Sequence, residues 1–167
     1  MAGVQLEAEV KSMLYTIACV VKIKENHFTQ MIDGFRMDID KSDRLQICEV
    51  ADERIPQKAG EKVNSMIIHA EAEKLKSVID RSDYIIVLCI EGRKTTTSEL
   101  AAQIKKAADR GCGTVTFVIG GSLGLAPEII RMADYKMSIS NMTFPHQLMR
   151  VALAEQLAKV SRMWRQI

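Results

Sequence analysis

The chain has few of the residues that mark linkers, and no segment suited to crossing a membrane. It holds three prolines in 167 residues, and no glycine–serine stretch or run of like charge interrupts it. A linker between domains is usually rich in such residues, so we expect one domain with its own core. No apolar run reaches the roughly 18–20 residues that a transmembrane helix needs. The first twelve residues lack a signal-peptide pattern, and we interpret them as an extension before a domain over residues 13–167.

The chain also lacks paired cysteines. Its four cysteines stand far apart, and none forms the CxxC pair typical of zinc sites. We therefore expect no metal, and we interpret Cys19, Cys48, Cys89 and Cys112 as buried, reduced thiols of a cytoplasmic protein. The net charge of +2 gives no strong overall field toward nucleic acid, although a local basic face stays open.

Apolar residues follow two periods that alternate along the chain. A β-branched apolar run over residues 14–21, an alternating pattern over 45–50 and a fully apolar run over 83–90 predict strands, and we expect two more over 114–119 and 136–139. Helical spacing predicts helices over residues 25–38, 57–79, 98–110, 127–133 and 144–164. This alternation indicates an α/β domain with a mostly parallel sheet between helices. Ligands of such sheets bind at the carboxyl ends of strands, here the turns after Leu88, Ile119 and Ile139.

A glycine-rich turn follows the predicted strand over residues 114–119. Its sequence, Gly120-Gly-Ser-Leu-Gly124, is neither a GxGxxG motif nor a Walker A loop, so ATP chemistry has little support. Glycines permit either close approach of the backbone to a ligand or a tight turn between strand and helix, and both interpretations stay open. With the polar loop in residues 138–150, this turn could wall a pocket with backbone N–H and C=O groups. Such a pocket suits a planar heterocycle.

Polar residues elsewhere allow more than one role. Thr97 or Ser98 is expected to cap the helix that follows, and Arg93 and Lys94 just before them could approach a phosphate. His146 is either a proton carrier or a hydrogen-bonded structural residue, since no obvious triad partner stands next to it.

The last predicted helix is basic. Arg150, Lys159, Arg162 and Arg165 form either a solvated face or, with Trp164, a surface that pairs with RNA phosphates and stacks on bases. The spacing alone does not choose between them.

Three segments occur in an order and at separations that fit one known family. They are residues 86–94 with Ser98-Glu-Leu-Ala101, residues 117–125, and residues 138–156. On these segments the chain resembles the RlmH family of SPOUT-class methyltransferases, which methylate a pseudouridine in large-subunit ribosomal RNA. The resemblance runs from about Met13 to Gln156, most of the chain.

The resemblance implies a trefoil-knotted α/β fold, a homodimer and S-adenosylmethionine bound in the knot. It implies methylation at N3 of a pseudouridine in 23S ribosomal RNA, with the RNA or the ribosome as partner. By motif position the cofactor contacts would be Leu88, Gly120, Gly121, Ser140, Asn141, Met142, Thr143, Phe144 and Pro145. The catalytic base is not assigned, and His146 and Arg150 are the candidates. Candidate RNA contacts are Arg93, Lys94, Lys159, Arg162, Trp164 and Arg165.

The chain departs from the family pattern mainly in its substrate half. Ala158-Lys159 stands where an aromatic–arginine pair is usual, and Cys89 replaces an acidic or polar residue. The family's Pro-Tyr-His tail is absent from the sequence after Ser161. We expect an RNA methyltransferase. The alternatives are a paralogue that binds S-adenosylmethionine or RNA as a regulatory module, and an enzyme that methylates a different RNA.

Overall fold

Strands and helices alternate along the chain, as the two apolar periods predict. The structure, a computed structural model, describes residues 11–21, 23–81 and 83–167. The elements are β1 (Leu14–Val20), α1 (Asn26–Asp38), β2 (Arg44–Val50), α2 (Glu61–Lys76), β3 (Tyr84–Lys94), α3 (Thr97–Asp109), β4 (Thr114–Ile119), α4 (Pro127–Arg131), β5 (Tyr135–Ser138), α5 (His146–Met163) and a final 3₁₀ turn, η1 (Trp164–Gln166).

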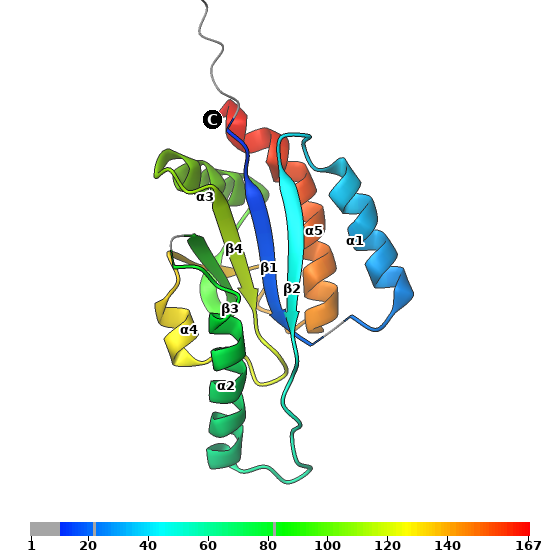
Figure 1. Cartoon of the computed structure of the whole chain (residues 1–167), viewed down its shortest axis with the longest axis vertical. Coiled ribbons are helices and arrows are strands. Elements are labelled where there is room, and N and C mark those ends of the chain that lie inside the picture. Colours follow the sequence, from blue (N-terminus) through cyan, green and yellow to red (C-terminus); the bar gives the residue numbers. More distant parts are fainter. Residues whose placement is uncertain (1–10, 22, 82) are drawn as a thin grey trace, which may run out of the picture.

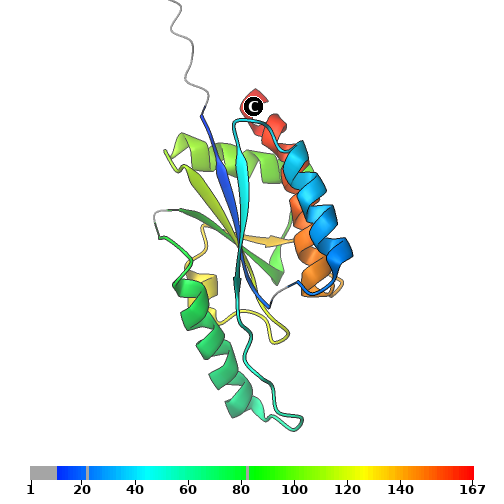
Figure 2. The same ribbon diagram turned by 45° about the vertical axis from the view of Figure 1, so that its right-hand side comes forward.

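The five strands form one sheet in the order β2-β1-β4-β3-β5, and every neighbouring pair runs parallel (Figure 1). Helices α1, α3 and α5 cover one face of the sheet, and α2 and α4 cover the other (Figure 2). The predicted fold class, a parallel sheet between helices, is confirmed. The trefoil knot stays a prediction.

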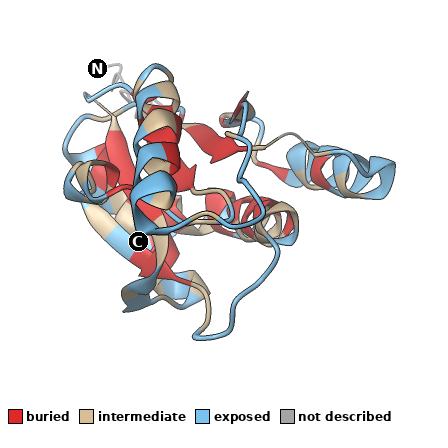
Figure 3. Ribbon diagram, turned by 90° about the horizontal axis from the view of Figure 1, so that it is seen from below, coloured by how far each residue is buried: buried red, intermediate tan, exposed pale blue. Residues whose placement is uncertain are grey.

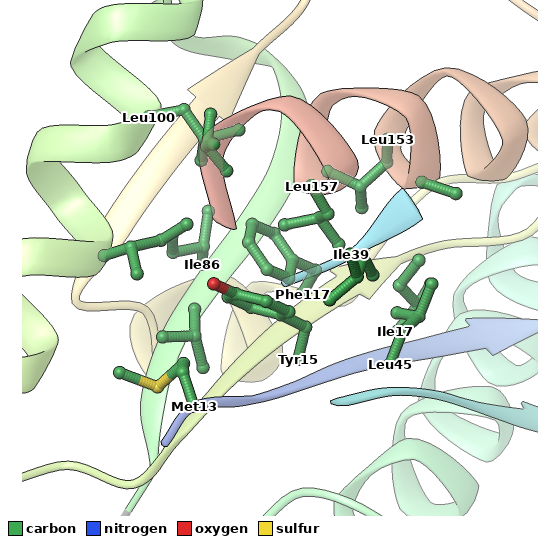
Figure 4. Packing of buried hydrophobic residues seen from close by; sticks show 14 of the residues in the cluster. Met13, Tyr15, Ile17, Ile39, Leu45, Ile86, Leu100, Phe117, Leu153 and Leu157 are labelled. Carbon is green, nitrogen blue, oxygen red and sulfur yellow. The ribbon is translucent and has the colours of Figure 1, made fainter. Parts of the chain in front are cut away.

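The core has two layers because successive residues of a strand point to opposite faces of the sheet. In β1, Tyr15 and Ile17 pack toward α1, α3 and α5, whereas Ala18 and Val20 pack toward α2 and α4. Figure 4 shows Tyr15 beside Phe117 of the neighbouring strand, with Leu157 of α5 packed over them. Burial is concentrated on the strands, and the helices carry buried residues on one side only (Figure 3).

Several predicted boundaries were wrong, and so was the predicted cap of α3. Helix α2 begins at Glu61 rather than residue 57, because Gly60 is extended, and it ends at Lys76 rather than 79. Strand β3 continues past Gly92 to Lys94, since an irregularity after Leu88 lets Arg93 and Lys94 pair with β5. The cap of α3 is Thr96, which accepts from the Glu99 amide while the Glu99 carboxylate accepts from the Thr96 amide.

All four cysteines are free; Cys19 is buried, which raises its pKa to about 12, and the other three are half-buried rather than buried as expected. Within residues 11–21, 23–81 and 83–167, no group of three or more His, Cys, Asp or Glu side chains could hold a metal ion. No helix in that same part of the chain has the length and apolarity to cross a bilayer.

A buried polar network ties the end of the chain to the amino end of the sheet. The Asp43 carboxylate, with no exposed side-chain area, accepts from the Tyr15 hydroxyl at 2.6 Å and from the Met13 amide at 2.9 Å. Arg165 pairs with the same carboxylate and stacks over the Trp164 ring. The Trp164 indole N–H donates to the Tyr15 hydroxyl at 3.0 Å. Burial, followed by the bond to Asp43, raises the pKa of the Tyr15 phenol, which therefore stays protonated.

Candidate active site

A cavity of about 800 Å³ opens at the carboxyl edge of the sheet. It lies where the irregular part of β3 after Leu88 and the turns after β4 and β5 meet the start of α5, at the edge toward which the strand arrows of Figure 1 point. Its lining comes from residues 88–91, 119–125, 130, 137–140, 142–146 and 149. The structure thus brings together the segments after Leu88, Ile119 and Ile139, although the segment after Leu88 is an irregular part of β3 rather than the predicted turn.

The cavity walls are apolar side chains combined with backbone. Leu88, Ile119, Leu125 and Met149 contribute hydrocarbon, while the glycine-rich turn contributes peptide groups. Pockets of this size and mixture suit a drug-sized planar ligand, whose orientation is fixed by a few polar contacts.

The glycine-rich turn is tight, and its own geometry requires the glycines. Gly124 has φ +83°, and its amide donates to the Gly121 carbonyl at 3.0 Å. A Cβ on Gly120 would lie 2.7 Å from the Gly124 backbone. A Cβ on Gly121 would lie 3.1 Å from Glu71 Oε2 and 3.3 Å from Val20 Cγ1. A side chain on Gly121 would therefore point toward Glu71 and Val20 behind the turn, whereas the Gly121 backbone lines the cavity.

The second wall is the loop between β5 and α5. Ser138 donates to the Ser140 carbonyl at 2.9 Å, and Ser140 Oγ accepts from the Met142 amide at 3.0 Å. These bonds fold the loop into a compact turn that ends at Pro145, the residue before α5. Of the predicted cofactor residues, Asn141 alone lies outside the lining.

Gly92 shapes the cavity, although the sequence did not single it out. A Cβ there would lie 2.6 Å from the Met137 carbonyl carbon, so only glycine lets the end of β3 approach β5 this closely. The approach places residues 88–91 along the cavity. A glycine directly after a buried strand was the signal that could have found it.

His146 is the titratable imidazole of the cavity. It is the first residue of α5 and half-buried. Burial and the charge of Arg150 lower its pKa, and Asp52 partly opposes them. Its ring is therefore neutral at neutral pH and can accept a proton. Cys89, also in the lining, stays a thiol because burial and the neighbouring Glu91 raise its pKa.

Arg150, the other catalytic candidate, does not line the cavity. Its side chain is completely buried behind the start of α5 and faces the ends of β1 and β2. The structure thus separates the two candidates, with His146 in the cavity and Arg150 behind it.

The candidate RNA contacts fall into two groups. Arg93 and Lys94 are exposed at the end of β3, directly after the cavity segment, and Arg93 pairs with Glu99. Lys159 and Arg162 are exposed far along α5, about 20 Å from its start at 1.5 Å per residue. Trp164 is 3% exposed and Arg165 pairs with Asp43, so both side chains belong to the buried polar network at the amino end of the sheet.

The family of the chain follows from its similarity to known proteins. Residues 13–166 match the family described as "Predicted SPOUT methyltransferase". The chain belongs to the SPOUT methyltransferase family. The sequence-based assignment is confirmed, and with it the assignment as an enzyme.

Several relatives of this SPOUT methyltransferase carry one name. The "Ribosomal RNA large subunit methyltransferase H" of Bifidobacterium animalis subsp. lactis (strain AD011) is 40% identical over 141 residues, which cover 84% of this chain and 89% of that protein. The protein of the same name from Clostridioides difficile (strain 630) is 39% identical over 150 residues, 90% of this chain and 94% of its own.

A solved structure supports the fold. "A probable methylase family protein" of Haemophilus influenzae Rd KW20 superposes with a TM-score of 0.54 over 91% of this chain and 68% of that one. At 14% sequence identity, this likeness speaks for the fold alone.

Proposed function

We propose that this SPOUT methyltransferase transfers a methyl group from S-adenosylmethionine to N3 of a pseudouridine in large-subunit ribosomal RNA, in the cytoplasm. The observation that carries the proposal is the cavity at the carboxyl edge, walled by two compact backbone loops in a chain about 40% identical to proteins named for this RNA. The single neutral imidazole in the lining adds a proton acceptor.

The residues fit the cofactor by size and chemistry. A cavity of about 800 Å³ accommodates a nucleoside with an amino-acid arm. Leu88 and the turn at Gly120 and Gly121 would hold one side of it, and Ser140 with the loop over 142–145 the other. Asn141 would contribute through the loop's backbone.

The chemistry divides between cofactor and chain. S-adenosylmethionine would supply a methyl group bonded to a positively charged sulfur. A nucleophile attacks such a methyl group in line with the sulfur, which is the leaving group. The chain must align the ring nitrogen with that methyl group, and positioning provides much of the rate. As the N3–methyl bond forms and the sulfur–methyl bond breaks, the N3 proton must leave. The neutral imidazole of His146 is the acceptor we propose.

The substrate and the partner chain would meet at the mouth of the cavity. Arg93 and Lys94 would pair with RNA phosphates there, with Lys159 and Arg162 as a more distant basic pair. Ile90, Met142 and Phe144 at the mouth are 57%, 70% and 37% exposed. Apolar side chains this exposed favour cover by another surface, and we assign that cover to a second copy in a homodimer.

The test is transfer of labelled methyl from S-adenosylmethionine to ribosomes that lack the pseudouridine methylation, with nucleoside mass analysis of the product. Methylpseudouridine at a single site supports the proposal. Binding of S-adenosylmethionine without transfer to these ribosomes would contradict the assigned substrate, and total RNA would then reveal a different target. His146→Gln should bind the cofactor and lose most of the transfer, since general bases contribute about 10²–10⁴-fold.

A further inference from the structure

Arg150 is a charged residue that the proposed reaction does not use. Its side chain has no exposed area. Nη1 donates to Glu49 Oε2 at 3.0 Å, and Nη2 donates to the carbonyls of Val20, at 2.6 Å, and of Val21. A buried guanidinium is costly unless it is well paired. Two of the groups that pair with this charge are backbone carbonyls of the turn at the end of β1, so the Arg150 side chain holds that turn in place.

That turn is strained. Val21 has φ 77°, and it is the one non-glycine residue with positive φ in the described part of the chain. A β-branched side chain makes this conformation unfavourable. The Val21 amide donates to the Val50 carbonyl at 2.9 Å, while its carbonyl accepts from Arg150. Glu49 also accepts from the Ile23 amide at 2.7 Å. Strain held by contacts on all sides is a frequent mark of a functional position.

The strained turn lies between the two walls of the cavity. On one side, Val20 Cγ1 lies 3.3 Å from the Cβ position of Gly121, so it packs directly against the glycine-rich turn. On the other side, Arg150 follows His146 by one turn of α5, whose first residues form the opposite wall. Arg150, Val21 and Val20 thus connect the start of α5 with the glycine-rich turn.

We propose that Arg150 is a positioning residue: by holding the strained Val20–Val21 turn it fixes the distance between the two walls and so sets the fit of the cavity to its ligand. The inference rests on the proposed function for the identity of that ligand, S-adenosylmethionine. The geometry it describes belongs to the free protein and can be measured without the ligand.

The first test is Arg150→Lys, which keeps the charge but lacks the planar fork that bonds two carbonyls and a carboxylate together. We expect S-adenosylmethionine affinity by calorimetry to fall about five- to tenfold, the size of a modest coupling between neighbouring sites. Arg36→Lys, a change at an exposed arginine of α1, is the matched control and should bind as the unchanged protein does.

A second substitution makes the test specific to the turn. Glycine adopts positive φ without cost, so Val21→Gly added to Arg150→Lys should recover part of the lost affinity. A purely structural role for Arg150 would instead change the melting temperature of both variants and leave the affinity of the folded protein alone. Folded Arg150→Lys that binds within twofold of the unchanged protein, or a double variant without recovery, overturns the proposal.

Two further measurements keep the inference separate from the proposed function. If Arg150→Lys does not fold, Glu49→Gln tests the same holding contact at a side chain that is 31% exposed, with the same expected loss and the same overturning result. If the unchanged protein does not bind S-adenosylmethionine, the cofactor assignment fails. Amide NMR of the free protein then decides: shifts at both Gly121 and His146 in Arg150→Lys support the proposal, and an unshifted Gly121 refutes it.

Discussion

Asp43 at the amino edge of the sheet and Arg150 at the carboxyl edge have side chains with no exposed area, and the two are held in different ways. At the amino edge, Asp43 is surrounded by donors from β1, the segment before it and the end of the chain. At the carboxyl edge, Arg150 is bonded to carbonyls of a strained turn. Arg150 and Arg165 each leave a buried Nε without a hydrogen-bond partner, so the two sites differ in backbone strain: among the described residues, the positive φ of a non-glycine residue occurs at the carboxyl-edge turn, at Val21. The comparison assigns stability to the amino edge and ligand fit to the carboxyl edge.

The largest expected effect is at the amino edge. Asp43→Ala leaves Arg165 and the Tyr15 hydroxyl without their partner in a buried site, and breaking such a pair costs about 3–5 kcal/mol of unfolding free energy. Urea unfolding measures this loss. S-adenosylmethionine affinity of the folded fraction should not change, and a variant that lost affinity as much as stability would break the comparison.

At the carboxyl edge the matching change is Gly120→Ala. The new Cβ would meet the Gly124 backbone at 2.7 Å, so the glycine-rich turn must move. We expect overpacking to cost about 1–3 kcal/mol of stability and cofactor affinity to fall by about tenfold for each 1.4 kcal/mol of misfit. Calorimetry and thermal melting separate the two.

Gly34→Ala is the control for that change, because a Cβ there meets nothing within 4 Å on helix α1. Alanine should raise stability by about 0.5–1 kcal/mol and leave affinity alone. Gly121→Ala should fall between the two, since its contacts with Glu71 and Val20 start at 3.1 Å.

A third prediction concerns pH. The pKa of His146 is lowered in the folded protein, so between that pKa and the ordinary value near 6.5 the unfolded chain binds more protons. Unfolding free energy should therefore rise with pH in this window and be lost as pH falls through it. His146→Gln should flatten the dependence, measured by urea unfolding at a series of pH values. The same change at exposed His27 controls for the loss of an imidazole.

The smallest effects come from a matched pair of serines. Ser161 Oγ accepts from the Asp40 amide at 3.1 Å toward the amino edge, and Ser140 Oγ accepts from the Met142 amide at 3.0 Å beside the cavity. Ser140→Ala removes one hydrogen bond and Ser161→Ala removes two, because Ser161 Oγ also donates to the Ala158 carbonyl at 3.0 Å; each bond is worth about 1 kcal/mol. Ser161→Ala should lower the melting temperature only. Ser140→Ala should lower affinity and change the melting temperature less, because its single hydrogen bond is exposed. Equal effects of the two variants would argue against separate roles for the edges.

The sequence was sufficient to predict the sheet, because β1, β3 and β4 hold apolar, β-branched-rich runs, β2 alternates, and the helices have an apolar period. It also placed the cavity, since parallel strands present their turns at one edge. It did not separate His146 from Arg150. Both are polar residues near one helix start, and only the tertiary structure shows that one faces the cavity and the other faces β1.

Two other features depended on contacts between distant segments. Trp164 and Arg165 were predicted at the surface because basic and aromatic residues at a helix end usually lie there, yet Asp43, more than a hundred residues earlier, binds them. Gly92 is required by Met137, whose approach depends on the pairing of β3 with β5. Neither partner lies within reach of a local pattern.

The position of Trp164 has an optical consequence. It is the single tryptophan of the sequence, and it lies at the opposite end of α5 from the cavity, about 27 Å from His146 at 1.5 Å per residue. The fluorescence emission of Trp164 therefore reports on packing at the amino edge, where the indole contacts the Tyr15 hydroxyl and the Arg165 guanidinium. A change in that emission on ligand binding would show that the conformational effect of the ligand extends along the whole of α5.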